Sequence, residues 1–323
     1  MSMPLNELVR GVLFAVAAAS SFQLDVTAAS AAPRCENTSR PMQAVYTCVG
    51  FTSTRHFAEL VEGSLLTESP LSFVLSDCEL PELPANAFAD IPVHVLELSN
   101  VTVKSFGSSA DGLLVGDVEE TLEKLVFRDR SSLPASWSSL KNLKRLKVLR
   151  FFNMAALQLT SDCNALAGSL TIVEVVQSSI ARIDEDWLAR VTGLESLVIR
   201  DCDLKQFQRS MLPRPAPNLW NLDLIGNNLT SLPDDFGEDY PALKFLDLGS
   251  NYLTTVSRAS LAPLLDAPVE AVELGGNPLV CDCTVEHLRA FAAGLLSADC
   301  RAPEALRRRS VHDLTDEDLR CAA

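Results

Sequence analysis

The chain has 323 residues, of which 47% are hydrophobic and 21% are charged, and this composition excludes a generally disordered protein. Its formal net charge of −15 argues against nonspecific nucleic-acid binding, which requires a basic surface. Length alone would suggest about two domains.

Residues 1–31 have the pattern of a secretory signal peptide. Arg10 precedes an apolar run over 11–19, and small residues at 29–31 offer a cleavage site before Ala32. The run is too short for a membrane-spanning helix, and no other segment reaches about 18 apolar residues. We therefore expect a secreted, extracellular protein without a membrane span in the mature chain; an uncleaved N-terminal anchor is the alternative.

Residues 32–68 precede a series of repeats and are expected to form an N-terminal cap. Cys35 and Cys48 flank a polar stretch, and we expect them to close a small loop by a disulfide. Apolar side chains at helical spacing between Phe57 and Leu65 predict one short amphipathic helix. A cap of this kind covers the apolar end of the first repeat.

Residues 69–280 contain nine segments with one spacing rule, in which positions 1, 4 and 6 are apolar and position 9 is often Asn or Cys. The clearest segment runs from Leu219 through Leu222 and Leu224 to Asn227. A period near 24 residues with this internal pattern is the signature of a leucine-rich repeat. The ninth positions are Cys78, Val101, Arg130, Met154, Ser178, Cys202, Asn227, Asn251 and Asn277.

The repeat predicts an α/β fold, a leucine-rich-repeat solenoid in the form of a right-handed horseshoe. The apolar positions of each unit fall on a short strand, and successive strands form a parallel sheet on the concave face. Loops, 3₁₀ segments and short helices are expected on the convex face, with helices near 185–190 and 260–265. Such a fold offers a long surface and no preformed catalytic pocket, which favours recognition over chemistry.

The ninth position has a structural role. An Asn there can donate and accept hydrogen bonds with turn backbone groups that would otherwise be buried unpaired. The two Cys at this position can do so weakly, whereas Val101, Arg130 and Met154 cannot do it in the same way. We therefore predict that the first half of the solenoid, which also contains an insertion over 111–121, is less well specified than the second.

Residues 281–323 are expected to form a C-terminal cap. Its four cysteines follow the spacing Cys-x-Cys, then two single Cys, and come directly after Asn-Pro-Leu-Val at 277–280. This motif resembles the C-terminal cysteine-rich flank of animal extracellular leucine-rich-repeat proteins, a family that includes Toll-like and Slit-like ectodomains. The resemblance covers residues 69–323 and implies that the first Cys pairs with the third and the second with the fourth. The implied disulfides are Cys281–Cys300 and Cys283–Cys321.

Two features depart from the pattern of this family. The N-terminal flank has two cysteines where the family often has four, and Phe291 stands where the family often has Trp. Within the family, the chain also resembles a subgroup of arthropod secreted relatives, which is itself similar to the non-catalytic subunit of a crustacean luciferase complex.

Three of the nine cysteines have no partner in these disulfides. We expect Cys78 and Cys202 to be buried, because both occupy ninth positions. We expect them to be reduced, because five repeats separate them, which is too far for one disulfide. Cys163 is expected to be exposed, either as a free thiol or in an intermolecular disulfide. Zinc binding by the C-terminal cysteines with His287 is disfavoured, because zinc sites use closer Cys pairs and a secreted chain favours oxidation.

Three N-x-[ST] motifs suit an extracellular chain, and they place expected glycosylation sites at Asn37, Asn100 and Asn228. Chance occurrence is the alternative at each of them.

No motif in the chain indicates an enzyme. None of its four His lies in an H-E-x-x-H motif, and neither a G-x-S-x-G nor a P-loop motif occurs. A column of carboxylates could suggest a glycosidase, but we expect these side chains to be solvated on the sheet, with nothing to bury them and separate their pKa values. The column consists of Glu174, Asp223, Asp247 and Glu273.

The spacing of the repeats also predicts which strand residues face solvent on the concave side. In the middle repeats these residues are mostly apolar, with several Arg and two Phe among them, which is the composition of an interaction patch. The alternative is that β-branched residues simply favour strands. The predicted partner-binding residues are Val126, Arg128, Val148, Arg150, Phe152, Ile172, Val176, Val198, Arg200, Ile225 and Phe245.

We therefore expect a secreted recognition module that binds an extracellular protein partner on the concave sheet, with no cofactor, metal or nucleic acid. One alternative is a non-catalytic accessory subunit of a secreted enzyme complex. The other is a receptor ectodomain that pairs with a membrane protein.

Overall fold

The computed structural model describes residues 32–39, 44–62, 70–83, 88, 91–106, 118–166 and 168–321. These belong to one compact unit that begins at Ala32. The predicted signal peptide lies outside the described residues, as do Leu65 and most of the predicted insertion at 111–121.

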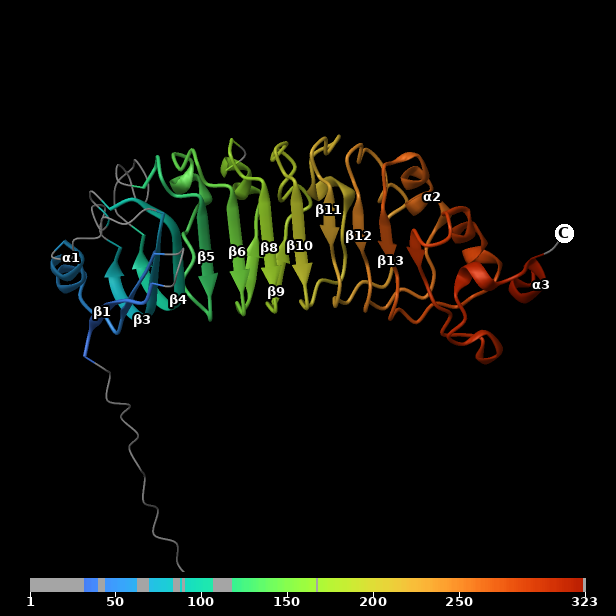
Figure 1. Cartoon of the computed structure of the whole chain (residues 1–323), viewed down its shortest axis with the longest axis horizontal. Coiled ribbons are helices and arrows are strands. Elements are labelled where there is room, and N and C mark those ends of the chain that lie inside the picture. The colour runs from blue at the N-terminus through green and yellow to red at the C-terminus, as the bar shows by residue number, and fades with distance from the viewer. Residues whose placement is uncertain are drawn as a thin grey trace, which may run out of the picture. The chain divides into compact units, whose positions relative to one another are not determined.

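Among the described residues of this unit, twelve strands form one sheet (Figure 1). From β2 to β14 each described strand pairs in parallel with its neighbours, and β1 pairs antiparallel with β2. In Figure 1 strands β5 to β13 of this sheet lie side by side and point in the same direction. The predicted parallel sheet of a leucine-rich-repeat solenoid is therefore confirmed. In sheet order the strands are β1 (Arg34–Asn37), β2 (Ala44–Val49), β3 (Leu71–Glu82), β4 (Val93–Ser105), β5 (Lys124–Arg128), β6 (Val148–Phe152), β8 (Ile172–Val176), β10 (Ser196–Arg200), β11 (Asn221–Asp223), β12 (Phe245–Asp247), β13 (Ala271–Glu273) and β14 (Leu296–Ser297).

The segments that return between sheet strands contain short elements. Strands β7 (Leu157–Leu159) and β9 (Ile180–Ile183) form a second, two-stranded parallel sheet. The helix expected near 260–265 is present as α2 followed by η4, whereas 185–190 consists of turns. The described helices are α1 (Thr54–Glu62), α2 (Arg258–Leu261) and α3 (Asp316–Leu319), and the 3₁₀ segments are η1 (Trp137–Leu140), η2 (Ser161–Leu166), η3 (Arg209–Met211), η4 (Ala262–Asp266), η5 (Cys283–Ala290), η6 (Glu304–Leu306) and η7 (Val311–Asp313).

Alternate side chains of each sheet strand enter one continuous apolar core. On β6, Leu149 and Phe151 are buried in this core, and the residues between and beside them point to the other face. Rings from neighbouring repeats fill the space: Phe127 stacks on Phe151 at 5.9 Å between centroids, and Trp137 meets Phe151 edge-on at 5.7 Å. Because burying one large apolar side chain contributes about 1.5–3 kcal/mol, packing between repeats holds the unit together.

Three asparagines form a hydrogen-bonded ladder where the chain leaves the strands of the last repeats. The side-chain Nδ2 of Asn251 donates to the carbonyl oxygens of Leu224 (2.9 Å) and Leu248 (3.0 Å), and its Oδ1 accepts from the backbone N–H of Leu229 (3.1 Å). Asn227 and Asn277 make equivalent bonds one repeat before and one repeat after. Each Asn thus joins two repeats through backbone groups that water does not reach.

The ladder continues into the earlier repeats through smaller side chains. The thiol of Cys202 donates to the carbonyl of Arg200 (3.2 Å) and accepts from the N–H of Ser178 (3.4 Å). The hydroxyl of Ser178 in turn accepts from the N–H of Met154 (3.0 Å). The turn at Met154, whose own side chain cannot bond, is therefore linked to the next repeat by a serine.

The ninth position predicted at Arg130 is wrong by one residue. Two consecutive residues, Asp129 and Arg130, have positive φ values of 52° and 66°, whereas the turn of the next repeat has one such residue, Asn153, before its ninth position. The extra residue brings Ser131 into the ladder, where it is buried and its hydroxyl accepts from the N–H of Val101 (3.0 Å). The turns in the first half of the solenoid are thus held by ladder hydrogen bonds that the spacing pattern does not indicate.

Segments that contain disulfides cover both ends of the core. At the N-terminal end, Cys35–Cys48 joins β1 to β2, and the N–H of Phe51 donates to the thiol of Cys78 (3.3 Å). At the C-terminal end the bridges are Cys281–Cys300 and Cys283–Cys321. Each bridge contributes about 2–4 kcal/mol by restricting the unfolded chain.

We predict that Asn251→Ala lowers the free energy of unfolding by about 1–3 kcal/mol, because it leaves the buried N–H of Leu229 without an acceptor, whereas the carbonyls of Leu224 and Leu248 keep the donors Asn227 and Asn277. Urea unfolding followed by circular dichroism measures this loss. Asn218→Ala is the matched control, since its exposed side chain bonds only the carbonyl of Thr192 among the contacts described. Equal losses in the two variants would contradict the ladder's role.

The shifted ninth position predicts unequal effects at two adjacent residues. Ser131→Ala should lower the free energy of unfolding by about 1–3 kcal/mol, because the buried N–H of Val101 loses its acceptor. Arg130→Ala should change it by less than about 0.5 kcal/mol, because Arg130 is exposed. The same urea experiment decides between the two positions, and a larger loss for Arg130→Ala would restore the original assignment.

Candidate partner-binding surface

The side chains of the sheet that point away from the core form a surface that we call the solvent face. Strand pairing aligns one residue from each sheet strand between β3 and β13, β7 and β9 not belonging to this sheet, in a central row, and adjacent rows run parallel to it. The central row is Val74, Glu97, Val126, Arg150, Glu174, Val198, Asp223, Asp247 and Glu273.

Every arginine predicted on this face is paired with a carboxylate on a neighbouring strand. Arg128 on β5 bonds Glu97 on β4 at 3.2 Å. Arg150 on β6 pairs with Glu174 on β8. Arg200 on β10 pairs in the same way with Asp223 on β11. The first two pairs are partly exposed on both sides and contribute about 0–1 kcal/mol each to stability. Their main effect is on the surface, because they leave little unbalanced charge beside the apolar side chains.

Six of the predicted apolar residues lie in the middle of the face, in the central row and in the two rows that flank the Arg150–Glu174 ion pair. Strand β6 pairs with β8, which places Val148 beside Ile172 and Phe152 beside Val176. The guanidinium of Arg128 lies over the ring of Phe152, 4.6 Å from its centroid. The half-buried apolar residues of this group are Val148, Phe152, Ile172, Val176, Val198 and Ile225.

Val126 does not belong to an accessible patch. It lies in the central row, but its exposed fraction is only 3% and it is not part of the core cluster. Its neighbours in the row are Glu97 and Arg150, and Lys124 and Arg128 flank it on the same strand. Four long side chains thus surround a short one, which accounts for its burial.

The carboxylate column was wrongly expected to be solvated throughout. Asp223 is buried and ion-paired with Arg200. Burial raises the pKa of Asp247, and the nearby charges of Asp223 and Glu273 act in the same direction, against the hydrogen bond from the N–H of Gly249. Asp223 and Asp247 with Glu273 therefore form a partly desolvated acidic strip at the C-terminal end of the solvent face.

An exposed aromatic residue, Trp220, was missed by the sequence analysis. It lies directly before β11 with an exposed fraction of 40%, and its ring meets that of Phe245, itself 38% exposed, edge-on at 6.0 Å. The equivalent position in the two adjacent repeats holds Glu195 and Lys244. The sequence therefore contained a signal for this residue, because the repeats on both sides have a charged residue at the position that Trp220 occupies.

The three cysteines outside the disulfides are all buried, so the expected exposure of Cys163 is wrong. Cys163 lies in η2, and burial raises the pKa of its thiol to about 12, with the charge of Asp162 acting in the same direction. A protonated thiol inside the core cannot form an intermolecular disulfide in the folded state.

The three predicted glycosylation sites differ in accessibility. Asn37 is exposed at the end of β1. Asn100 is exposed too, but its Nδ2, the atom that would carry a glycan, donates to Asp77 at 2.7 Å. Asn228 is half-buried beside the ladder. Asn37 is therefore the most open of the three acceptors.

Within the described parts of the chain, no group of three or more His, Cys, Asp or Glu side chains is arranged to hold a metal ion. The same residues contain no helix with the length and apolar character needed to cross a bilayer.

Known proteins resemble both the sequence and the fold. A family model described as leucine rich repeat matches residues 217–267. Trophoblast glycoprotein of Macaca fascicularis is 32% identical over 135 residues, which cover 40% of this chain and 32% of that protein. The platelet glycoprotein Ib beta chain of Mus musculus is 31% identical over 162 residues, or 48% of this chain and 65% of that protein.

More distant relatives extend the likeness. Toll-like receptor 2 of Homo sapiens is 24% identical over 221 residues, which cover 61% of this chain and 27% of the receptor. Each of these three sequence matches spans less than two thirds of the relative's own length. The crystal structure of human trophoblast glycoprotein superposes with a TM-score of 0.50 at 22% identity, over 86% of this chain and 94% of that one. This likeness shows the fold. The repeat pattern, the parallel sheet, the match at residues 217–267 and this likeness together show that the chain has a leucine-rich-repeat fold.

Proposed function

We propose that this protein is a secreted recognition module that binds an extracellular protein partner on the solvent face of its sheet. The observation that carries the proposal is the set of half-buried apolar residues around Phe152, in positions where strands usually carry polar residues. The paired arginines lower the charge around it, so a partner could cover this area without leaving ions unpaired.

The composition of the surface resembles that of protein interfaces. Arginine and aromatic residues are enriched at such interfaces and dominate their binding energy. Phe152 with Arg128 supplies one such centre, and the Trp220–Phe245 pair supplies a second toward the C-terminal end. We infer that Val148, Arg150, Ile172, Val176, Val198, Arg200 and Ile225 complete the contact, and that the buried Val126 takes no part.

Three disulfides and three possible glycan acceptors support an extracellular location. By their names, one relative is a receptor and another is one chain of a platelet glycoprotein. A glycan on Asn100 would hold partners away from the N-terminal part of the solvent face. No catalytic role is proposed, because the carboxylate with a raised pKa, Asp247, lies on an open sheet without a described partner for acid–base chemistry.

Two other functions lead to different outcomes when the partner is isolated. Crosslinking the protein in its own culture fluid, followed by mass spectrometry, identifies what it contacts. Recovery of an enzyme at fixed stoichiometry would indicate an accessory subunit. Recovery from membranes rather than from culture fluid would indicate a receptor ectodomain.

Replacing Phe152 by Ala should weaken binding of the crosslinked partner by about 30-fold, the loss expected for an interface hot spot of about 2 kcal/mol. The urea midpoint should stay nearly unchanged, because Phe152 lies outside the apolar core. Tyr252→Ala is the matched control, since this exposed aromatic residue lies off the sheet strands. Titration by biolayer interferometry gives both affinities; a Phe152→Ala variant that binds like the native chain removes this residue from the site.

A further inference from the structure

A pocket of about 400 Å³, which we call the edge pocket, lies where the turns after β12 and β13 meet the C-terminal cap. The repeats contribute Asn251, Tyr252 and residues 276–278 to its lining, and the cap contributes residues 299–301 and Arg308. The repeat residues come after their strands have ended, so the pocket is separate from the rows of the solvent face. Its volume is within the range of ligand-binding pockets.

Two arginines of the cap are neighbours in this pocket. The N–H of Arg308 donates to the carbonyl of Cys300 (2.8 Å), and the N–H of Cys300 donates to the carbonyl of Arg309 (3.0 Å). Arg301 follows Cys300 directly, so it lies close to Arg308, and both arginines are exposed and line the pocket. Like charges on neighbouring paired segments repel each other.

The backbone of Arg308 adopts a conformation that glycine usually takes at this kind of position. Its φ is 66°, and together with Arg309 it forms a β-bulge opposite Cys300. In a bulge with this hydrogen-bond pattern the first residue is left-handed and is usually Gly, because a Cβ disfavours the conformation. An arginine at this position therefore has a backbone cost that a glycine would avoid, and its charged side chain lines the pocket.

The two arginines also lack the carboxylate partners that other arginines of the chain have. Neither Arg301 nor Arg308 forms an ion pair with a carboxylate among the described residues. In the same segment of the cap, Arg307 pairs with Glu304 at 3.3 Å. The repulsion between the two guanidinium groups is thus not relieved by an ion pair within the described chain.

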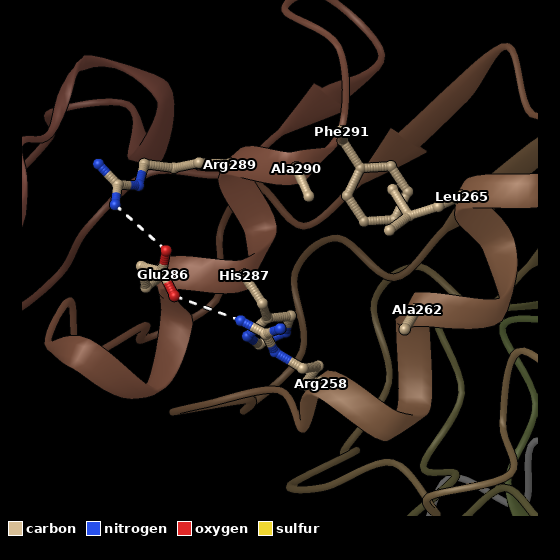
Figure 2. Close-up of a pocket in the computed structure, with 8 residues that line it drawn as sticks. All are labelled: Arg258, Ala262, Leu265, Glu286, His287, Arg289, Ala290 and Phe291. Carbon is tan, nitrogen blue, oxygen red and sulfur yellow. Dashed lines mark hydrogen bonds and ion pairs between the residues drawn. The ribbon is translucent and has the colours of Figure 1, made fainter.

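Figure 2 shows another pocket, between α2, η4 and the cap, in which the charges are balanced. There Glu286 pairs with Arg258 (3.3 Å) and with Arg289 (3.5 Å). The edge pocket instead combines two unpaired guanidinium groups with one carboxylate, that of Asp299. In a chain with a net charge of −15, this local excess of positive charge favours an anionic occupant.

Two further side chains restrict what can carry the anionic group. Asp299 is exposed, and its carboxylate accepts hydrogen bonds but repels a second negative charge. Tyr252 is 58% exposed, so its ring offers a flat apolar surface. The pocket therefore suits a molecule with one negative group, hydroxyl donors and an apolar face. A sugar ring with one carboxylate has all three, whereas an acidic side chain of a peptide has no hydroxyl groups beside its carboxylate.

We propose that the edge pocket binds an acidic sugar unit of a glycan, a hexuronate or a neuraminate. Its carboxylate accepts charge-assisted hydrogen bonds from Arg301 and Arg308, a hydroxyl group donates to Asp299, and the C–H face of the ring lies against Tyr252. Because this pocket is separate from the solvent face, the glycan and a protein partner would bind independently.

Titration of the full chain with methyl β-D-glucuronide, methyl α-N-acetylneuraminide and the neutral methyl β-D-glucoside tests the need for the carboxylate. With ¹⁵N-labelled arginine, the Nε–H signals of Arg301 and Arg308 report occupancy by NMR. We expect one or both acidic sugars to bind at least about tenfold more tightly than the glucoside, the ratio that one hydrogen bond to a charged group supplies. Equal affinities for all three, or shifts confined to other arginines, would overturn the proposal.

Cyclohexanecarboxylate and the α-amide of N-acetyl-glutamic acid carry a carboxylate without sugar hydroxyls. Both should bind at least about threefold more weakly than the preferred sugar. If the glutamate derivative binds as tightly as the sugar, the pocket recognises acidic peptides and the sugar assignment is wrong. In Asp299→Ala, cyclohexanecarboxylate should bind more tightly, because a repelling charge is gone, and the sugar should lose its advantage. A sugar preference that persists in this variant would contradict the hydroxyl contact.

Arg308→Gly and Arg320→Gly form a matched pair of variants. Both arginines are exposed and have positive φ values of 66° and 55°, so glycine removes one positive charge and relieves the backbone in each case. Arg320 lies outside the pocket. Arg308→Gly should weaken binding of the acidic sugar at least about tenfold without lowering the urea midpoint, whereas Arg320→Gly should keep the affinity within about twofold. Equal losses in the two variants would contradict the proposed site.

Discussion

The solenoid depends on how it satisfies the backbone groups buried at the end of each strand. Each repeat turns sharply after its strand, and carbonyl and N–H groups in that turn face the interior. Asn227, Asn251 and Asn277 bond these groups within their own repeat and in the repeat before. Because each Asn bonds both its own repeat and the one before, the side chain that closes a turn also fixes the spacing of the strands and hence the rows of side chains on the solvent face.

The spacing of apolar residues predicted the parallel sheet and the alignment of side chains across it. Val74, Glu97 and Asp247 fall in one row in the structure, as the ninth-position count indicates. The count failed at Arg130, because one inserted turn residue moved the bonding position to Ser131. A serine hydroxyl can replace an asparagine in the ladder, and a pattern that looks for Asn or Cys does not find it.

Which side chains of the solvent face are buried was harder to predict than how these side chains align in rows. Val126 and Asp223 occupy positions that point away from the core, yet both are buried. Their neighbours decide this: long charged side chains surround the valine, and Arg200 pairs with the aspartate. Cys163 shows the same limit in a return segment, since a polar surrounding sequence did not reveal its place in the core. Alternation gives the direction of a side chain, whereas exposure depends on contacts across repeats.

The solvent face combines two arrangements with different chemistry. In the middle, paired charges surround an apolar group, which suits a partner that excludes water. Toward the C-terminal end, an acidic strip runs beside the Trp220–Phe245 pair, and burial already raises the pKa of Asp247 there. A positive group on a partner would relieve this repulsion, so the two ends of the interface would contribute affinity and orientation separately.

The most direct test of recognition by the solvent face is hydroxyl-radical footprinting of the protein, alone and bound to its crosslinked partner. Phe152 and Phe245 should be protected from oxidation in the complex, while exposed Tyr252 reacts as before. Unchanged oxidation of both phenylalanines, with protection confined to the return segments on the opposite side, would contradict it.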